Sequence, residues 1–183
     1  MFLTRRPYID DHPTEPGPPF TRYSLKDESS MLYREANVLY WAKALLKMTY
    51  DFVDCAIQGA EASPPFNIPR LRFVDAGLLL TYSSAAVAPP EGSKRPAKPS
   101  GMVCTMFLAE EFIPTTSDAD FVKYIHNGDA VPCDLINARA EEIALFLAFT
   151  QHVQYTRTGG QVYISDYQGS ELLLTDPQIL THP

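Results

Sequence analysis

The stretch "SDYQGSELLLTDPQI", residues 165–179, combines two carboxylates and an amide in a pattern that could bind a metal ion. Gln168 follows Asp166 closely, and Asp176 comes after an apolar run and before Pro177. Carboxylate and amide oxygens are the ligands that Mg²⁺ takes in proteins. A Mg²⁺ ion held here could neutralise the charge of a triphosphate. A second interpretation stays open, in which the same side chains only hydrogen-bond to the backbone of a turn.

The segments around this stretch predict how it is positioned. "QVYISDY" alternates as a strand does, which places Val162 and Ile164 on one face and Asp166 at the strand's end, where a loop begins. The preceding segment, 134–160, reads as a long helix closed by Gly159-Gly160. Its predicted buried face consists of Ala140, Ile143, Leu147 and Thr150.

The N-terminal part predicts a second long helix among short strands. Ser24 and Asp27 have capping-box spacing, so the helix should begin there. Its apolar face is expected to contain Leu32, Ala36, Leu39, Ala42, Leu46 and Val53. Strands are predicted near residues 1–7, 72–75, 77–82 and 102–113, an extended piece at 121–129, and Pro-rich loops at 10–22 and 83–101.

Composition limits the classes of function. With 183 residues and 45% hydrophobic residues, the chain can bury a core as one domain or two small lobes. A net charge of −7 argues against nucleic acid or an anionic membrane as the main partner. The three cysteines form no CxxC pair, and no signal peptide or membrane-spanning run is visible. We therefore expect a soluble, cytoplasmic protein.

The segment "GGQVYISDYQGSELLLTDPQI" resembles the signature of the alpha-kinases, a family of atypical protein kinases. Its Asp-x-Gln-Gly and Thr-Asp-Pro elements have the family's spacing. "AEEFIP…FVKYIHNG" is similar to the family's hinge followed by Phe-x-Lys-Tyr and Asn-Gly, and "YREANVLYWAKALLKMTY" corresponds to its N-lobe helix. The resemblance extends over nearly the whole chain.

This resemblance implies an α+β, two-lobed kinase fold, with an N-lobe over about 1–108 and a C-lobe over about 109–183. It implies an ATP- and Mg²⁺-dependent serine/threonine kinase that acts on a protein. Asp166 matches the catalytic aspartate, and Gln168 and Asp176 match the Mg²⁺ ligands. Glu110 and the backbone near Phe112 match the hinge that meets adenine, and Arg5 is nearest to the position of the family's ATP-binding lysine.

The sequence also departs from the family pattern. The glycine-rich phosphate loop would lie before Met1, and the zinc-binding His/Cys tail would follow "TDPQILTHP", so we expect a domain truncated at both ends. His152 matches the first zinc ligand, but a structural zinc takes four ligands, so an ordinary role for His152 is expected. Two other hypotheses remain: a non-catalytic kinase-like module that binds a protein or a nucleotide, and a hydrolase with Asp166 and Asp176 as its carboxylate pair.

Overall fold

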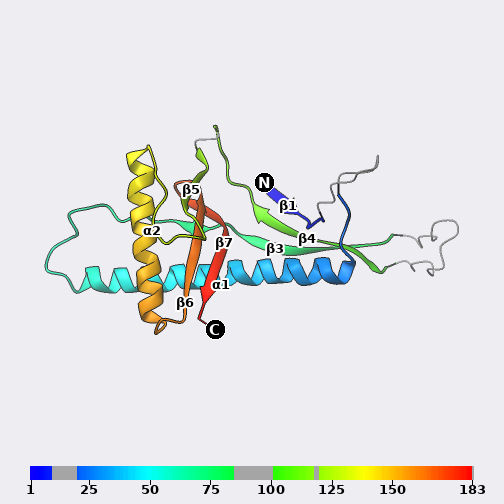
Figure 1. Ribbon diagram of the computed structural model, residues 1–183, viewed down its shortest axis with the longest axis horizontal. Helices are drawn as coiled ribbons and strands as arrows, with labels where there is room; N and C mark the ends of the chain where they lie inside the picture. The colour runs from blue at the N-terminus through cyan, green and yellow to red at the C-terminus, as the bar shows by residue number, and fades with distance from the viewer. Residues whose placement is uncertain (10–19, 85–100, 118–119, 183) are drawn as a thin grey trace. The chain divides into compact units, whose positions relative to one another are not determined.

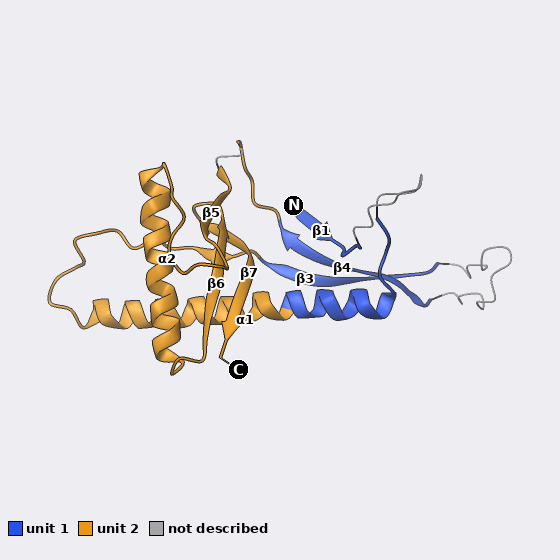
Figure 2. Ribbon diagram, in the orientation of Figure 1, with its two compact units in different colours: residues 1–36, 75–111 blue, residues 37–74, 112–183 orange. Residues whose placement is uncertain are grey.

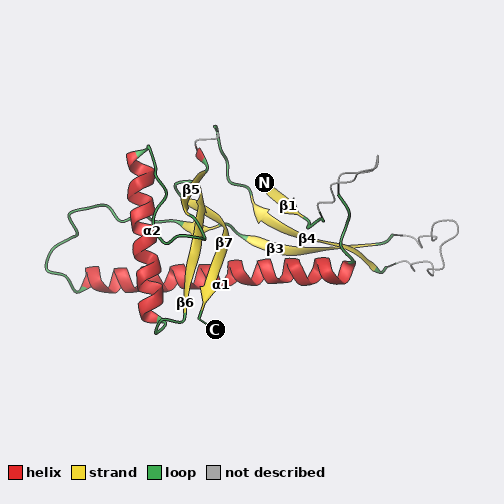
Figure 3. Cartoon of the chain, viewed as in Figure 1, coloured by secondary structure: helices red, strands yellow, loops and turns green. Residues whose placement is uncertain are grey.

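The computed structural model describes residues 1–9, 20–84, 101–117 and 120–182 (Figure 1). Within these ranges it has a mixed α+β fold with two helices and two sheets (Figure 3). The elements in chain order are β1 (Phe2–Arg5), α1 (Leu25–Gln58), β2 (Arg72–Phe73), β3 (Ala76–Tyr82), β4 (Val103–Glu111), β5 (Val122–Ile125), α2 (Ala138–Arg157), β6 (Val162–Gly169) and β7 (Leu173–Thr181).

Helix α1 begins and buries the residues that the sequence predicts. The Ser24 hydroxyl accepts the backbone N–H of Asp27 at 3.2 Å and donates to the Asp27 carboxylate at 2.6 Å, which caps the first turn. Leu32, Ala42 and Leu46 are buried, as expected from their shared helical face. The predicted helical period is therefore confirmed.

The chain divides into two compact units (Figure 2), and the first comprises residues 1–36 and 75–111. Its sheet has the order β1-β4-β3, with both neighbouring pairs antiparallel. Leu32 of α1 packs against Met106 and Leu108 of β4, so a small apolar cluster joins the helix to the sheet.

The second unit comprises residues 37–74 and 112–183. Its sheet has the order β2-β7-β6-β5, in which β2 pairs with β7 in parallel and the other pairs are antiparallel. Helix α2 packs on β5 and β6. Ile143, Leu147, Tyr124 and Tyr167 are buried there, and the Phe73 ring stacks on Tyr167 at a centroid distance of 6.3 Å.

Two irregularities interrupt the pairing of β6 with β7. The partner of Ile164 is Ile179, but the partner of Asp166 is Gln178, so β6 has one extra residue there. The partner of Gln168 is then Thr175, which leaves an extra residue in β7. The prediction that Asp166 ends a strand is wrong, because β6 continues to Gly169 as half of a hairpin.

The predicted Pro-rich loops coincide largely with residues 10–19 and 85–100, which lie outside the described residues. Among the helices that the structure describes, none combines the length and the apolar character needed to cross a membrane.

Candidate functional site

Four polar side chains from β5, β6 and β7 form a connected chain of hydrogen bonds. The Lys123 ammonium donates to the Asp166 carboxylate in an ion pair and to the amide oxygen of Gln168 at 3.2 Å. The amide nitrogen of Gln168 donates to the Asp176 carboxylate at 3.2 Å. The structure thus brings together Asp166, Gln168 and Asp176, the three residues that the sequence singled out.

Strand register explains why these side chains meet. Lys123 pairs directly with Gln168 across the β5–β6 ladder. Successive strand residues point to opposite faces, so Lys123 points away from the face on which Val122 and Tyr124 pack in the core. The extra residue in β6 lets both Ile164 and Tyr167 enter the core, and it places Asp166 on the same face as Gln168.

The backbone at Asp176 adopts an uncommon conformation. Asp176 has φ of 50°, a left-handed conformation that is uncommon for residues other than glycine. Pro177 follows it and carries no N–H, so this pair suits the irregular point of the ladder. Conformations of this kind cluster at functional sites. Asp176 is also the last member of the chain of hydrogen bonds that begins at Lys123.

A separate residue holds the hairpin turn. The Ser170 hydroxyl accepts the backbone N–H groups of Leu172 at 3.4 Å and Leu173 at 3.1 Å. The alternative that Asp166 and Gln168 serve only as turn caps finds no support in these contacts, because their side chains bond to other side chains in mid-sheet. Nearby, Asn127 donates to the Gln178 side chain at 2.8 Å, and Gln178 is the ladder partner of Asp166.

The residues fit a magnesium ion in chemical type. Two carboxylates and one amide oxygen supply hard oxygen ligands. In the part of the chain that the structure describes, no group of three or more His, Cys, Asp or Glu side chains gathers into a metal site. A metal here would therefore depend on the amide oxygen of Gln168 as well as on carboxylate oxygen.

Lys123 was not singled out as a site residue from the sequence. Its position within "FVKY" was visible only as part of the family resemblance. What places it beside Asp166 is the register of β5 against β6, which no local pattern reveals.

Two residues predicted to meet the nucleotide belong to the first unit. Glu110 is buried in β4, and its carboxylate lies 2.5 Å from the Arg5 side chain in an ion pair. Arg6 forms a second ion pair with the fully buried Glu28 of α1. Phe112 follows β4 directly, belongs to the second unit and is half-buried. Their predicted roles stay predictions.

His152 lies on α2 with its side chain exposed. Its buried neighbours Gln151 and Val153 face the core of the second unit.

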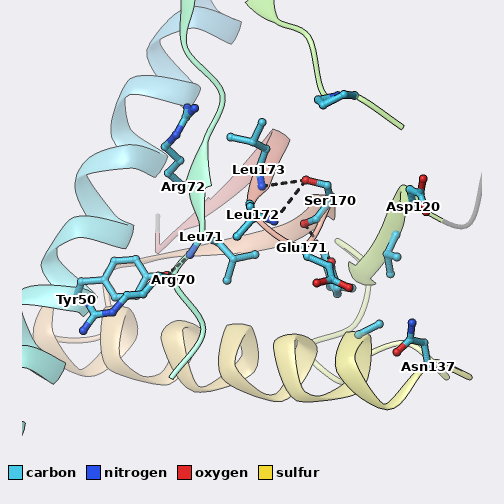
Figure 4. A pocket seen from close by; sticks show the side chains of 14 residues that line it. Tyr50, Arg70, Leu71, Arg72, Asp120, Asn137, Ser170, Glu171, Leu172 and Leu173 are labelled. Carbon is cyan, nitrogen blue, oxygen red and sulfur yellow. Dashed lines mark hydrogen bonds between the residues drawn. The ribbon is translucent and has the colours of Figure 1, made fainter. Parts of the chain in front are cut away.

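A pocket of about 1020 Å³ lies elsewhere in the second unit (Figure 4). Tyr50, Arg70 and Leu172 are among the residues that line it, with Asn137 at the start of α2. Its lining includes Val122 and Tyr124 but none of the four connected polar residues. Since strand side chains alternate, the pocket and Lys123 belong to opposite faces of β5.

A sequence model of the alpha-kinase family matches residues 26–183 of this chain. The chain belongs to the alpha-kinase family. This match extends over both units and includes the motif from which Asp166, Gln168 and Asp176 project. The resemblance expected from the sequence is thereby confirmed. No curated protein matches this alpha-kinase chain significantly.

The chain is also similar to solved alpha-kinase domains. It is 16% identical to the alpha-kinase domain of myosin heavy chain kinase A in complex with AMP, covering 88% of this chain and 50% of that one with a TM-score of 0.49. For the complex of the same kinase domain with ADP, the identity is 18%, the coverages are 87% and 48%, and the TM-score is 0.47. The chain therefore spans about half the length of the solved domains it matches.

Proposed function

We propose that this chain carries the metal-binding and hydroxyl-orienting part of an alpha-type protein serine/threonine kinase domain with a two-lobed, kinase-like fold. The observation that supports this most directly is the chain of contacts from Lys123 through Asp166 and Gln168 to Asp176 on one face of a sheet. Family membership supports the reaction class, ATP-dependent phosphoryl transfer to a protein hydroxyl.

Each residue has a proposed role that the family resemblance implies and that its chemistry allows. Asp166 has a buried carboxylate held by Lys123, and it would orient the attacking hydroxyl and accept its proton. Gln168 and Asp176 would hold Mg²⁺ through their oxygens. When bound, Mg²⁺ would neutralise charge on the phosphates of ATP. The protein's own contribution is then positioning, which is the main source of rate in phosphoryl transfer.

Nucleotide binding is proposed to involve Glu110, Phe112 and Arg5, as the family resemblance implies. The ion pair between Arg5 and Glu110 gives both side chains a partner within the first unit. An arginine keeps the positive charge of the family's lysine, but its planar guanidinium has different geometry for a phosphate.

The ion pair between Arg5 and Glu110 also supports a second function. If Glu110 holds Arg5 permanently, the guanidinium cannot serve a phosphate, and the chain would be a kinase-like module that binds a nucleotide or a protein without transfer. The two functions differ in whether nucleotide binding depends on a metal at Gln168 and Asp176.

A fluorescent ATP analogue, titrated with and without Mg²⁺, tests the proposal. Wild type should bind the analogue more tightly with Mg²⁺. Asp176→Ala should remove this dependence, because it deletes a charged metal ligand. Asp166→Asn should keep binding within about threefold, roughly 0.7 kcal/mol, since its proposed partner is the substrate hydroxyl, yet it should abolish phosphoryl transfer.

Asp51→Ala is the matched control, because Asp51 is an exposed carboxylate on α1 that pairs with Lys47. It should change neither binding nor its metal dependence. Nucleotide binding that ignores Mg²⁺ in wild type would favour the non-catalytic module. No nucleotide binding in any variant would contradict the kinase function and leave a non-catalytic module that binds a protein.

A further inference from the structure

The Lys123 ammonium contacts one oxygen donor that the proposed function assigns to the metal, the amide oxygen of Gln168, and also the Asp166 carboxylate beside it. It contacts the Asp166 carboxylate and lies 3.2 Å from the amide oxygen of Gln168. The contact with the amide oxygen of Gln168 is one that a bound cation would make with the same atom. The site therefore already contains one positive charge from the chain itself.

Burial makes this charge necessary. The Asp166 side chain is 6% exposed, and a buried carboxylate without a counter-charge is costly. The Lys123 side chain is 33% exposed, so its head group can turn toward solvent. Lys123 is thus less constrained than its partner.

Two hydrogen bonds fix the orientation of the Gln168 amide group. Its nitrogen donates to Asp176, and its oxygen accepts from Lys123. This orientation presents the oxygen, the atom that a metal would also need, toward the ammonium. A metal and Lys123 would consequently compete for the same face of the amide.

We propose that Lys123 is the resident counter-ion of this site, and that a divalent cation binds to Gln168 and Asp176 only by displacing the ammonium from the amide oxygen of Gln168. This inference rests on the metal site of the proposed function. Displacement lowers the affinity for free metal, because two positive charges repel each other at short range in partly buried surroundings. Lys123 then acts as a positioning residue that keeps Asp166 and Gln168 aligned between binding events.

Manganese binding without nucleotide tests the proposal, with Mn²⁺ standing in for Mg²⁺ and free Mn²⁺ followed by electron paramagnetic resonance. Lys123→Met removes the charge and keeps much of the side-chain length. It should bind Mn²⁺ at least about tenfold more tightly than wild type. Lys123→Arg keeps the charge and should bind about as weakly as wild type.

Lys47→Met is the matched control, because it makes the same change in net charge at an exposed position on α1 that pairs with Asp51. Its Mn²⁺ affinity should equal that of wild type. Any gain seen in Lys123→Met but not in Lys47→Met then belongs to the site and not to the overall charge.

A second measurement uses only wild type, in case Lys123→Met does not fold. An amine-reactive reagent labels lysines, and mass spectrometry gives the labelling rate of Lys123 relative to Lys47. Saturating Mn²⁺ should raise this ratio, because the displaced ammonium becomes more exposed. An unchanged ratio at saturation would overturn the proposal.

The results separate this inference from the proposed function. Equal Mn²⁺ affinity in wild type and Lys123→Met would overturn displacement and leave the metal site intact. If neither wild type nor Lys123→Met binds Mn²⁺ but the ATP analogue binds in a Mg²⁺-dependent way, the displacement proposal is overturned and the proposed function is not. Absence of both kinds of binding would overturn the inference and the proposed kinase function together.

Discussion

At the scale of single residues, Gly169 occupies a position that permits no side chain. Its φ is 147°, and a Cβ atom there would overlap the Leu173 carbonyl oxygen and lie 2.9 Å from the Leu174 Cα. The close approach closes the β6–β7 hairpin at its turn. Because Gln168 is the preceding residue, this glycine also fixes where the amide of Gln168 meets β7.

Gly169→Ala should lower the free energy of unfolding by about 3 kcal/mol or more, since the new methyl group collides with backbone and the conformation is strained. Urea denaturation measures the change. Gly128→Ala is the control in the same unit, because its nearest neighbouring atom would be 3.8 Å away, on the His126 ring. A Gly169→Ala protein as stable as Gly128→Ala would contradict this account of the hairpin.

At the scale of elements, two glutamines of α2 attach the helix to the irregular part of β6. The Gln154 side-chain oxygen accepts the backbone N–H of Ile164 at 2.9 Å, and Gln151 donates to the Ile164 carbonyl at 2.9 Å. Both backbone groups adjoin the extra residue in β6, where ladder pairing shifts. Side chains of the helix thus satisfy buried backbone groups that would otherwise be costly.

Gln154→Leu should destabilise the fold by about 1–3 kcal/mol, because it keeps the approximate size of the side chain but leaves the Ile164 N–H without its acceptor. It also removes the 3.2 Å bond to the Tyr167 hydroxyl. Gln161→Leu is the control, since Gln161 is exposed just before β6. Chemical denaturation of both variants gives the comparison. Similar stabilities for the two would show that the contacts to Ile164 contribute little.

At the scale of the whole molecule, the candidate residues are divided between the two units. Asp166, Gln168, Asp176 and Lys123 belong to the second, whose core also contains two buried phenols, Tyr124 and Tyr167. Burial raises the pKa of Tyr124 to about 12, with a smaller contribution from the charge of Glu171. Burial likewise raises the pKa of Tyr167, although its hydrogen bonds with Thr150 and Gln154 oppose the shift.

The raised pKa values predict a loss of stability in alkali. The unfolded chain releases the phenolic protons near pH 10, and the folded chain holds that of Tyr124 to about pH 12. The free energy of unfolding should therefore be unaffected by these groups below pH 10 and fall between pH 10 and about 12. Denaturation of wild type across this range measures the slope.

The double variant Tyr124→Phe, Tyr167→Phe should lose most of that slope, although it is less stable at neutral pH because the Tyr124 bond to the Ser170 carbonyl is gone. Tyr40→Phe is the control at an exposed position on α1. An unchanged slope in the double variant would show that other groups govern alkaline unfolding.

The sequence by itself determined the features that depend on neighbours along the chain. The cap at Ser24, the buried faces of α1 and α2 and the positions of most strands follow from local spacing, because helix and strand periods are set by the backbone. Family membership also followed from the chain's motifs, since "SDYQGSELLLTDPQI" keeps the order and spacing of its polar residues.

Only the tertiary structure decided how the polar residues meet. Alternation from Ile164 would place Asp166 on the core face, but the extra residue in β6 moves it to the opposite face with Gln168. The pairing of Lys123 with Asp166 depends on the register between strands that are separated by α2 in the sequence. Register is fixed by cross-strand packing and hydrogen bonds, which the pattern within one strand does not contain.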